Sequence, residues 1–348
     1  MTALVPVATA RRGGLAESHH FAAAVAVTPS GDAVASLGDP GFATFSRSAV
    51  KPFQALPLVL AGGGERFALD DADLALICGS HSGRPEQVER ARSLLARGGF
   101  AVDDLLCGAH LPFDPETRQR LSAAGAAPTP LDNNCSGKHA GMLLACRALD
   151  LPAAGYVDPA HPLQRRIAET VALFAGVAVE EIGVAVDGCS APTFHLPLAA
   201  LARAYAALVA PELAPALHRL QAARREALAA ACRRVVAAMT GAPEMVAGPG
   251  RFTTRLMRVT GGRLLAKEGA EGVYAVGVRG PVALGVALKI ADGGERARDG
   301  VVLELLRQLG VLSGEEFAAL DDLYRPVLVN HRGLAVGEVV TDFELEPA

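Results

Sequence analysis

The stretch from Leu256 to Ala291, LMRVTGGRLLAKEGAEGVYAVGVRGPVALGVALKIA, decides the fold class. Short apolar runs alternate in it with the segments TGG, GAEG and RGP. Glycine and proline between short apolar runs are typical of strands joined by tight turns. We therefore expect an antiparallel meander over these residues.

Strands and helices are both expected outside this stretch. FAAAVAVTPSGDAVASLG at 21–38 predicts a hairpin, and IGVAVDGCSAPTF at 182–194 predicts a buried strand running into a turn. Helical spacing and length predict helices at 53–64 (bent or interrupted at Pro57), 161–176, 214–239 and 295–310. The sequence therefore predicts an α+β fold, with helices packed on an antiparallel sheet. Residues 1–348 are expected to form a single catalytic domain, with two closely packed lobes as the alternative.

Composition excludes several classes of protein. The chain is 51% hydrophobic with a net charge of −4, which argues against a broad phosphate-binding surface for nucleic acid. Its apolar runs are too short to span a bilayer. Arg11 and Arg12 are not followed by the apolar segment of an export signal. We expect a cytoplasmic protein whose six scattered cysteines are reduced.

The segment SRSAVKPFQ, residues 46–54, lies where an extended stretch becomes a helix. Ser48 and Lys51 are three residues apart, so they are neighbours on one helical face. A lysine beside a serine hydroxyl is one known way to activate a nucleophile. The alternative is structural, because serine is a common helix cap and Lys-Pro fits a first helical turn.

Three further regions combine reactive side chains with small residues. Ser80, His81 and Ser82 stand between glycines, a pattern that suits a turn as well as a site. NNCSGKHAG and VDGCSAPTF carry thiols, an amine and a carboxylate whose spacing gives only a weak metal signal, although two thiolates plus nitrogen make a sensible zinc set. NNCSGKHAG lacks the spacing of a phosphate loop. Lys267 is expected on a strand, where an isolated lysine is usually a solvated charge.

Eight ordered segments carry a resemblance to one family. They are SRSAVKPFQALPLV, SHSGRPEQV, CGAHLPFDP, NNCSGKHAGML, HPLQRRI, DGCSAPTFHLPLAALARAYA, PEMVAGPGRFTTRLM and KEGAEGVYAVGV. In this order they resemble the blocks of the rhizobial-type, thermolabile L-asparaginase family. The resemblance implies a fold like that of serine β-lactamases and penicillin-binding proteins. It also implies hydrolysis of L-asparagine to L-aspartate and ammonia by a homodimer.

The resemblance further assigns roles to individual residues. It implies two catalytic Ser-Lys pairs, with Ser48 as the nucleophile, and these pairs are Ser48 with Lys51 and Ser80 with Lys267. It implies a zinc ion held by Cys135, Lys138 and Cys189. Substrate contact is expected from Arg47, His139 and Asp187, and Asp187 lies beside the zinc site. The chain departs from the family pattern at Arg84 and Gln87, where an acidic residue and histidine are usual. These departures concern substrate preference rather than the reaction.

Other functions remain open at this point. A glutaminase would run the same chemistry on a substrate with one more methylene, which a pocket discriminates only modestly. A β-lactam or peptide hydrolase would share the Ser48–Lys51 spacing. A non-catalytic amino-acid-binding or zinc-binding relative would keep the fold and leave both Ser-Lys pairs without a role.

Overall fold

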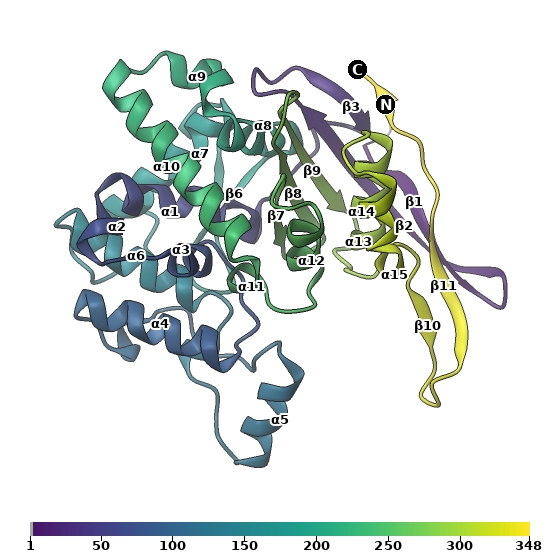
Figure 1. Ribbon diagram of the computed structural model, residues 1–348, viewed down its shortest axis with the longest axis horizontal. Coiled ribbons are helices and arrows are strands. Elements are labelled where there is room, and N and C mark those ends of the chain that lie inside the picture. Colours follow the sequence, from purple (N-terminus) through teal and green to yellow (C-terminus); the bar gives the residue numbers. More distant parts are fainter. Residues whose placement is uncertain (1–2) are drawn as a thin grey trace.

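Two antiparallel sheets form the β structure in the computed structural model, which describes residues 3–348 (Figure 1). The strands are β1 Val5–Arg12, β2 Leu15–Val27, β3 Ala33–Leu37, β4 Ala43–Phe45, β5 Gly183–Val186, β6 Pro192–Pro197, β7 Leu264–Gly269, β8 Val273–Val278, β9 Leu284–Ile290, β10 Val327–Val329, β11 Ala335–Thr341 and β12 Glu346–Pro347. The nine-stranded sheet has the order β10-β11-β1-β2-β9-β8-β7, with β3 beside β2 and β12 beside β3. The three-stranded sheet has the order β4-β6-β5.

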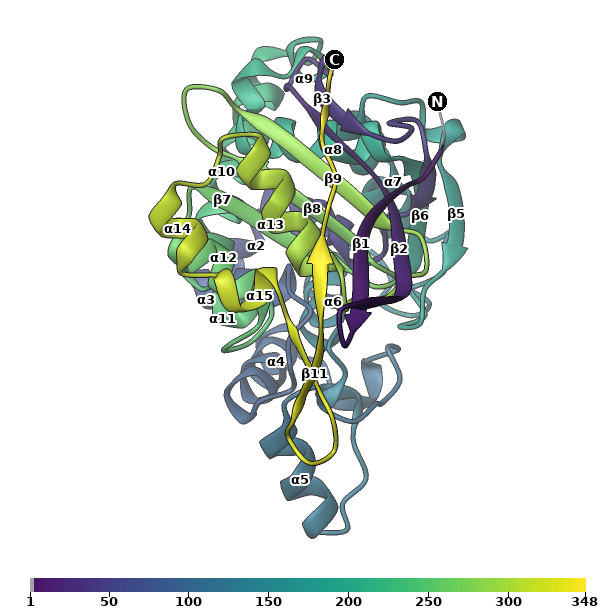
Figure 2. The same ribbon diagram turned by 90° about the vertical axis from the view of Figure 1, so that its right-hand side faces the viewer.

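Helices cover both faces of the large sheet. They are α1 Lys51–Leu60, α2 Gly63–Arg66, α3 Asp71–Ile77, α4 Pro85–Gly98, α5 Pro115–Ala123, α6 Ser136–Ala148, α7 Pro162–Ala175, α8 Leu198–Val209, α9 Pro215–His218, α10 Ala222–Gly241, α11 Pro243–Val246, α12 Phe252–Val259, α13 Arg298–Gln308, α14 Gly314–Ala318 and α15 Asp321–Tyr324. α8 packs directly on β2, β8 and β9. α13 lies on the opposite face, as Figure 2 shows. Helices packed on an antiparallel sheet confirm the α+β class.

The meander is confirmed in its central part and wrong at its start. β7, β8 and β9 pair as consecutive antiparallel strands. The residues before TGG belong instead to α12, whose Phe252, Leu256 and Met257 are buried on one side. Gly261 and Gly262 have φ angles of +57° and +74° and end this helix, so TGG separates a helix from a strand.

Two other predictions need correction. The strand expected to be buried at 182–194 is two strands, and the first of them, β5, is mostly exposed. β5 is an edge strand, whereas β6 is paired on both sides and buried. The helix expected at 214–239 is broken between α9 and α10. Leu217 and Leu228 are both buried, and their spacing fits one continuous helix equally well, so periodicity alone did not show the break.

The remaining elements agree with the sequence. β2 and β3 form the predicted hairpin, and α7 and α13 lie within the predicted helices at 161–176 and 295–310. α1 continues through Pro57 to Leu60, so the proline does not interrupt it, although it removes one amide donor. In residues 3–348 no helix has the length and hydropathy needed to cross a membrane.

Candidate active site

Two lysine amines meet at the hydroxyl of Ser80. The Nζ atom of Lys51 lies 2.8 Å from Ser80 Oγ, and the Nζ atom of Lys267 lies 2.9 Å from the same oxygen. Lys51 begins α1, Ser80 follows α3, and Lys267 is on β7. All three residues are buried. The fold thus brings together three groups that are far apart in the sequence, as the resemblance implied for Ser80 and Lys267.

Backbone and charged groups fix both amines. Lys51 also donates to the carbonyl of Gly79 at 2.6 Å, and Lys267 donates to that of Glu268 at 2.8 Å. The pKa of Lys267 is lowered from 10.5 to about 7, mainly by burial and in part by the nearby Lys51, although Glu268 opposes the shift. An amine with such a pKa is neutral in a large fraction of molecules at neutral pH. It can therefore accept a proton from a hydroxyl.

Lysine is used sparingly in this chain. The sequence has four lysines, Lys51, Lys138, Lys267 and Lys289, among 33 basic residues. The first three are buried, whereas Lys289 is half-buried on β9. Arginine does not lose its proton in proteins, whereas a buried lysine does. The chain therefore uses lysine mainly at buried positions, and at Lys267 burial favours the neutral amine.

Ser48 lies at the edge of this cluster. It occupies the short 3-10 turn Arg47–Val50 between β4 and α1, and it is half-buried. Ser48 and Lys51 are joined by the backbone, because the Lys51 amide donates to the Ser48 carbonyl. Within residues 3–348 their side chains are not hydrogen-bonded to each other, because the Lys51 amine is directed to Ser80 and Gly79. Arg47, just before Ser48, has a φ angle of +47°. This strained conformation is typical of functional sites.

An ion pair holds the Arg47 side chain. Its Nη2 lies 2.7 Å from Asp187 Oδ1, and its Nε donates to the same oxygen at 2.8 Å. Burial would raise the pKa of Asp187, but the Arg47 guanidinium and the Lys138 amine outweigh it and hold this pKa below its ordinary value. Arg47 and Asp187 are therefore charged and adjacent to Ser48. They suit recognition of a zwitterionic substrate.

Two thiols and an amine converge beside Asp187. Lys138 Nζ donates to Cys189 Sγ at 2.8 Å. The Cys189 thiol and the amines of Lys51 and Lys138 hold the pKa of Cys135 well below its ordinary value, although burial opposes this shift. Burial alone would lower the pKa of Lys138, but the thiols outweigh it and raise this pKa.

The two thiols and the lysine amine are ligand types that suit a soft or borderline metal ion. Across the described residues, no three His, Cys, Asp or Glu side chains come together as a metal site. The expected zinc set is different, since it has two thiols and a lysine. Thiolates and nitrogen are ligands that zinc prefers, and both thiols are buried here.

His81 and His139 are directed into the protein interior. Gly83 N donates to His81 Nδ1 at 3.1 Å, so Nε2 carries the proton and donates to Ser136 Oγ at 2.8 Å. Burial lowers the pKa of His81 to about 3, and it therefore ties the Ser80 loop to α6 as a neutral group. His139 Nδ1 lies 2.7 Å from the Tyr156 hydroxyl. Its Nε2 has no hydrogen-bond partner within residues 3–348.

Sequence reasoning missed two supports of the site. The buried Glu268 forms an ion pair at 2.6 Å with Arg251, which is partly exposed, beside Lys267, and its place next to Lys267 in KEG was the available signal. Gln87 accepts hydrogen bonds from the amides of Ser82 and Arg84 and donates to the carbonyl of Glu244 at 2.7 Å. The departure from the family pattern at Gln87 therefore lies in the support of the Ser80 loop.

The sequence matches the model of one known protein family. A sequence profile described as L-asparaginase II matches residues 8–341. The chain belongs to the L-asparaginase II family.

Solved structures give only distant similarity. The crystal structure of Mglu in its native form has 15% sequence identity and a TM-score of 0.44, and the match covers 84% of this chain and 65% of that one. Mglu in its glutamate form has 16% identity and a TM-score of 0.34, with coverages of 84% and 62%. The present chain thus spans less than two thirds of the length of these proteins. A comparison with curated protein sequences gives no match.

Proposed function

We propose that this protein is an L-asparaginase that hydrolyses L-asparagine to L-aspartate and ammonia through an acyl-enzyme on Ser48. The observation that carries the proposal is the pair of buried lysine amines on one serine hydroxyl, within 2.9 Å. An amide is hydrolysed by acyl transfer when an activated nucleophile lies next to a proton carrier. Membership in the family supplies the class of substrate.

The different exposure of Ser48 and Ser80 supports different roles for the two hydroxyl groups. Ser80 is 4% exposed, whereas Ser48 is half-buried and stands beside Arg47 and Asp187. Ser48 is therefore the hydroxyl that a substrate reaches, and Ser80 is the connection between the two lysines. Lys51 lies one turn beyond Ser48, so a rotamer change or a single water joins its amine to the Ser48 hydroxyl. Catalytic hydrogen bonds often tighten only when substrate is bound.

The proton path follows from this arrangement. Ser48 Oγ attacks the side-chain amide carbon, and its proton passes to Lys51 and then through Ser80 toward neutral Lys267. The lysine relay then delivers this proton to the leaving nitrogen, which departs as ammonia. Water attacks the ester and gives a proton to the same relay, which returns that proton to Ser48 Oγ as L-aspartate leaves. The Ser48 amide, which has no backbone acceptor outside its own helical turn in residues 3–348, is available to stabilise the oxyanion.

The remaining parts of the proposal concern architecture and location. The fold is that of the serine β-lactamase and penicillin-binding-protein type, with residues 1–348 as one catalytic domain. The active species is a cytoplasmic homodimer. Lys51 and Lys267, from distant parts of the chain, both bond Ser80, and this supports a single catalytic domain.

Zinc is proposed at Cys135, Lys138 and Cys189. Bound there, the ion would shape the substrate site beside Asp187, and the Ser-Lys groups would carry the acyl transfer. Lys138 would bind it as a neutral amine, and binding therefore releases protons. The donor types and the 2.8 Å contact between Lys138 and Cys189 support the assignment.

Purified protein reconstituted with zinc should contain about one zinc ion per chain. The Cys135→Ser and Cys189→Ser proteins should each lose most of it, because a hydroxyl is a much poorer zinc ligand than a thiolate. Metal analysis after dialysis provides the measurement, and Cys232→Ser, which changes a buried thiol elsewhere, is the control. Equal zinc content in all these proteins would refute the assignment.

The pH dependence should follow Lys267. Its base form is the neutral amine, so kcat/KM should rise with pH through about 7 and then level off. With only four lysines in the sequence, lysine-selective NMR gives a small set of side-chain signals, and Lys267→Met identifies the relevant one. A titration of that signal near 10.5, the ordinary value, would contradict the proposed role.

The same shift has a consequence for stability. Between pH 7 and 10.5 the unfolded chain holds a proton on Lys267 that the folded protein has released. The contribution of Lys267 to the free energy of unfolding therefore rises with pH in this window. Below pH 7 both states are protonated, and the full cost of burying the charge is present.

Purified protein should release ammonia from L-asparagine faster than from L-glutamine, and it should not open a chromogenic β-lactam. Faster release from glutamine would make the protein a glutaminase, and ring opening would make it a β-lactam hydrolase. No turnover of any of the three by zinc-loaded, folded protein would favour a binding protein.

A further inference from the structure

A groove lies at the far end of α1 from the catalytic cluster. It has a volume of about 660 Å³ and lies between α1, α7 and α10, with the end of α6 at one side. Pro57, Leu60, Leu149 and Leu173 give it an apolar lining. Its volume lies in the range of sites for small molecules.

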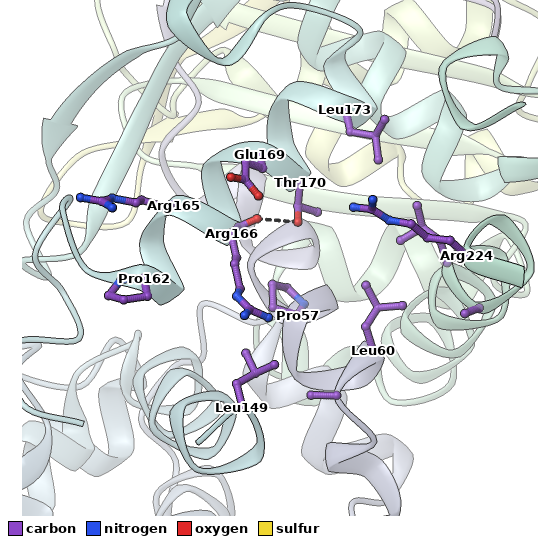
Figure 3. A pocket seen from close by; sticks show the side chains of 13 residues that line it. Pro57, Leu60, Leu149, Pro162, Arg165, Arg166, Glu169, Thr170, Leu173 and Arg224 are labelled. Carbon is purple, nitrogen blue, oxygen red and sulfur yellow. Dashed lines mark hydrogen bonds between the residues drawn. The ribbon is translucent and has the colours of Figure 1, made fainter. Parts of the chain in front are cut away.

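Arginines surround this apolar lining. Arg165, Arg166 and Arg224 line the groove together with a single carboxylate, Glu169. Figure 3 shows Arg166 extending from α7 beside Pro57, and Arg224 extending from α10 toward Thr170. The groove therefore has an excess of positive charge next to apolar surface.

Two arginines of the groove differ from two others on α10 in having no ion-pair partner in the part of the chain that the structure describes. Arg233 and Arg234 form ion pairs with Glu212 and Asp71. Neither Arg166 nor Arg224 has a carboxylate partner within residues 3–348, and both are exposed. Their guanidinium groups are thus available to an external anion, for which arginine offers two parallel hydrogen bonds.

The groove is separate from the catalytic site. Lys51 and Leu60 are the first and last residues of α1, so nine helical steps, roughly 14 Å, separate them along the axis. None of Ser48, Ser80, Lys51 and Lys267 lines the groove. A ligand in the groove therefore does not occupy the place of the amide substrate.

We propose that this groove is a second binding site, for a small molecule with one anionic group on an apolar body. The anionic group binds Arg166 and Arg224, and the apolar body covers Leu60, Leu149 and Leu173. Carboxylates, sulfonates and phosphate esters share this chemistry. The site does not depend on the activity proposed for Ser48.

Fluorescence titration of the full-length protein with 8-anilinonaphthalene-1-sulfonate tests the proposal, with decanoate, decanol and inorganic phosphate as competitors. Wild-type protein should bind the dye at one saturable site, and decanoate should displace it better than decanol or phosphate. The double variant Arg166→Ala/Arg224→Ala should bind at least about tenfold more weakly, because charged hydrogen bonds are lost. Arg332→Ala, which removes an exposed arginine in the turn between β10 and β11, should bind as wild type does.

Several outcomes would overturn the proposal. Equal dye affinity in the double variant would place the dye elsewhere. Displacement by phosphate as strong as that by decanoate would leave only a plain anion site. A change of sedimentation coefficient in the double variant, from dimer to monomer, would make the groove an interface between copies of this chain.

Discussion

The Ser48→Ala protein should lose turnover of L-asparagine by at least about 10⁴-fold in kcat, the scale on which enzymes lose a nucleophile. The reason is the position of Ser48 beside the charged Arg47–Asp187 pair and one helical turn before Lys51. Its hydroxyl makes no hydrogen bond with Lys51, so the alanine variant should keep the fold with a change of at most about 1 kcal/mol in unfolding free energy. Ammonia release and chemical denaturation provide the two measurements.

The control for this variant is Ser93→Ala, which removes an exposed hydroxyl on α4 and should behave as wild type. Ser80→Ala should also be slow, since it breaks the connection between Lys51 and Lys267. A folded Ser48→Ala protein with near-normal kcat, alongside an inactive Ser80→Ala protein, would identify Ser80 as the nucleophile.

The Lys267→Met protein should lose about 10²- to 10⁴-fold in kcat, the usual size of a general acid–base contribution. Methionine fills similar space without the amine, and burying a charge is costly, so stability should be unchanged or higher at pH 6. The matched control is Lys289→Met, which changes the half-buried lysine on β9. Its amine bonds backbone carbonyls away from the cluster.

This second prediction separates two mechanisms. If Lys267→Met keeps near-normal kcat and the same pH dependence as wild type, then Lys51 alone serves acylation and deacylation. If Lys267→Met and its control Lys289→Met lose activity equally, the loss comes from a general change in the protein, and the role of Lys267 is not supported.

Local sequence patterns correctly predicted the strands and helices that are determined by the residues of the segment itself. Turn residues around β8 and β9 and the apolar spacing of α7 and α13 were sufficient for these elements. The same information failed at β5, where an apolar run lies at an exposed sheet edge, and between α9 and α10, where the periodicity continues across a break. Burial and breaks depend on what packs against a segment, which the segment does not encode alone.

The candidate site shows the same division. The spacing of Ser48 and Lys51 indicated a local pair, but a backbone turn before α1 directs the lysine to Ser80, 29 residues later in the chain. The pKa of Lys267 near 7 arises mainly from its burial on the large sheet. No motif in the sequence predicts that this lysine is buried. Gln87 supports the Ser80 loop and Glu268 pairs with Arg251, and both sets of contacts form only when the chain is folded.

Peptide mapping of rapidly quenched reactions tests the central claim most directly. Wild-type and Lys267→Met proteins are mixed with L-asparagine, quenched in acid during turnover and digested. The account predicts an added aspartyl group on Ser48, in the peptide that contains residues 46–50, and a slower build-up of this group in Lys267→Met because Lys267 takes up the Ser48 proton during acylation. An aspartyl group on Ser80, or turnover with no covalent adduct in either protein, would contradict it.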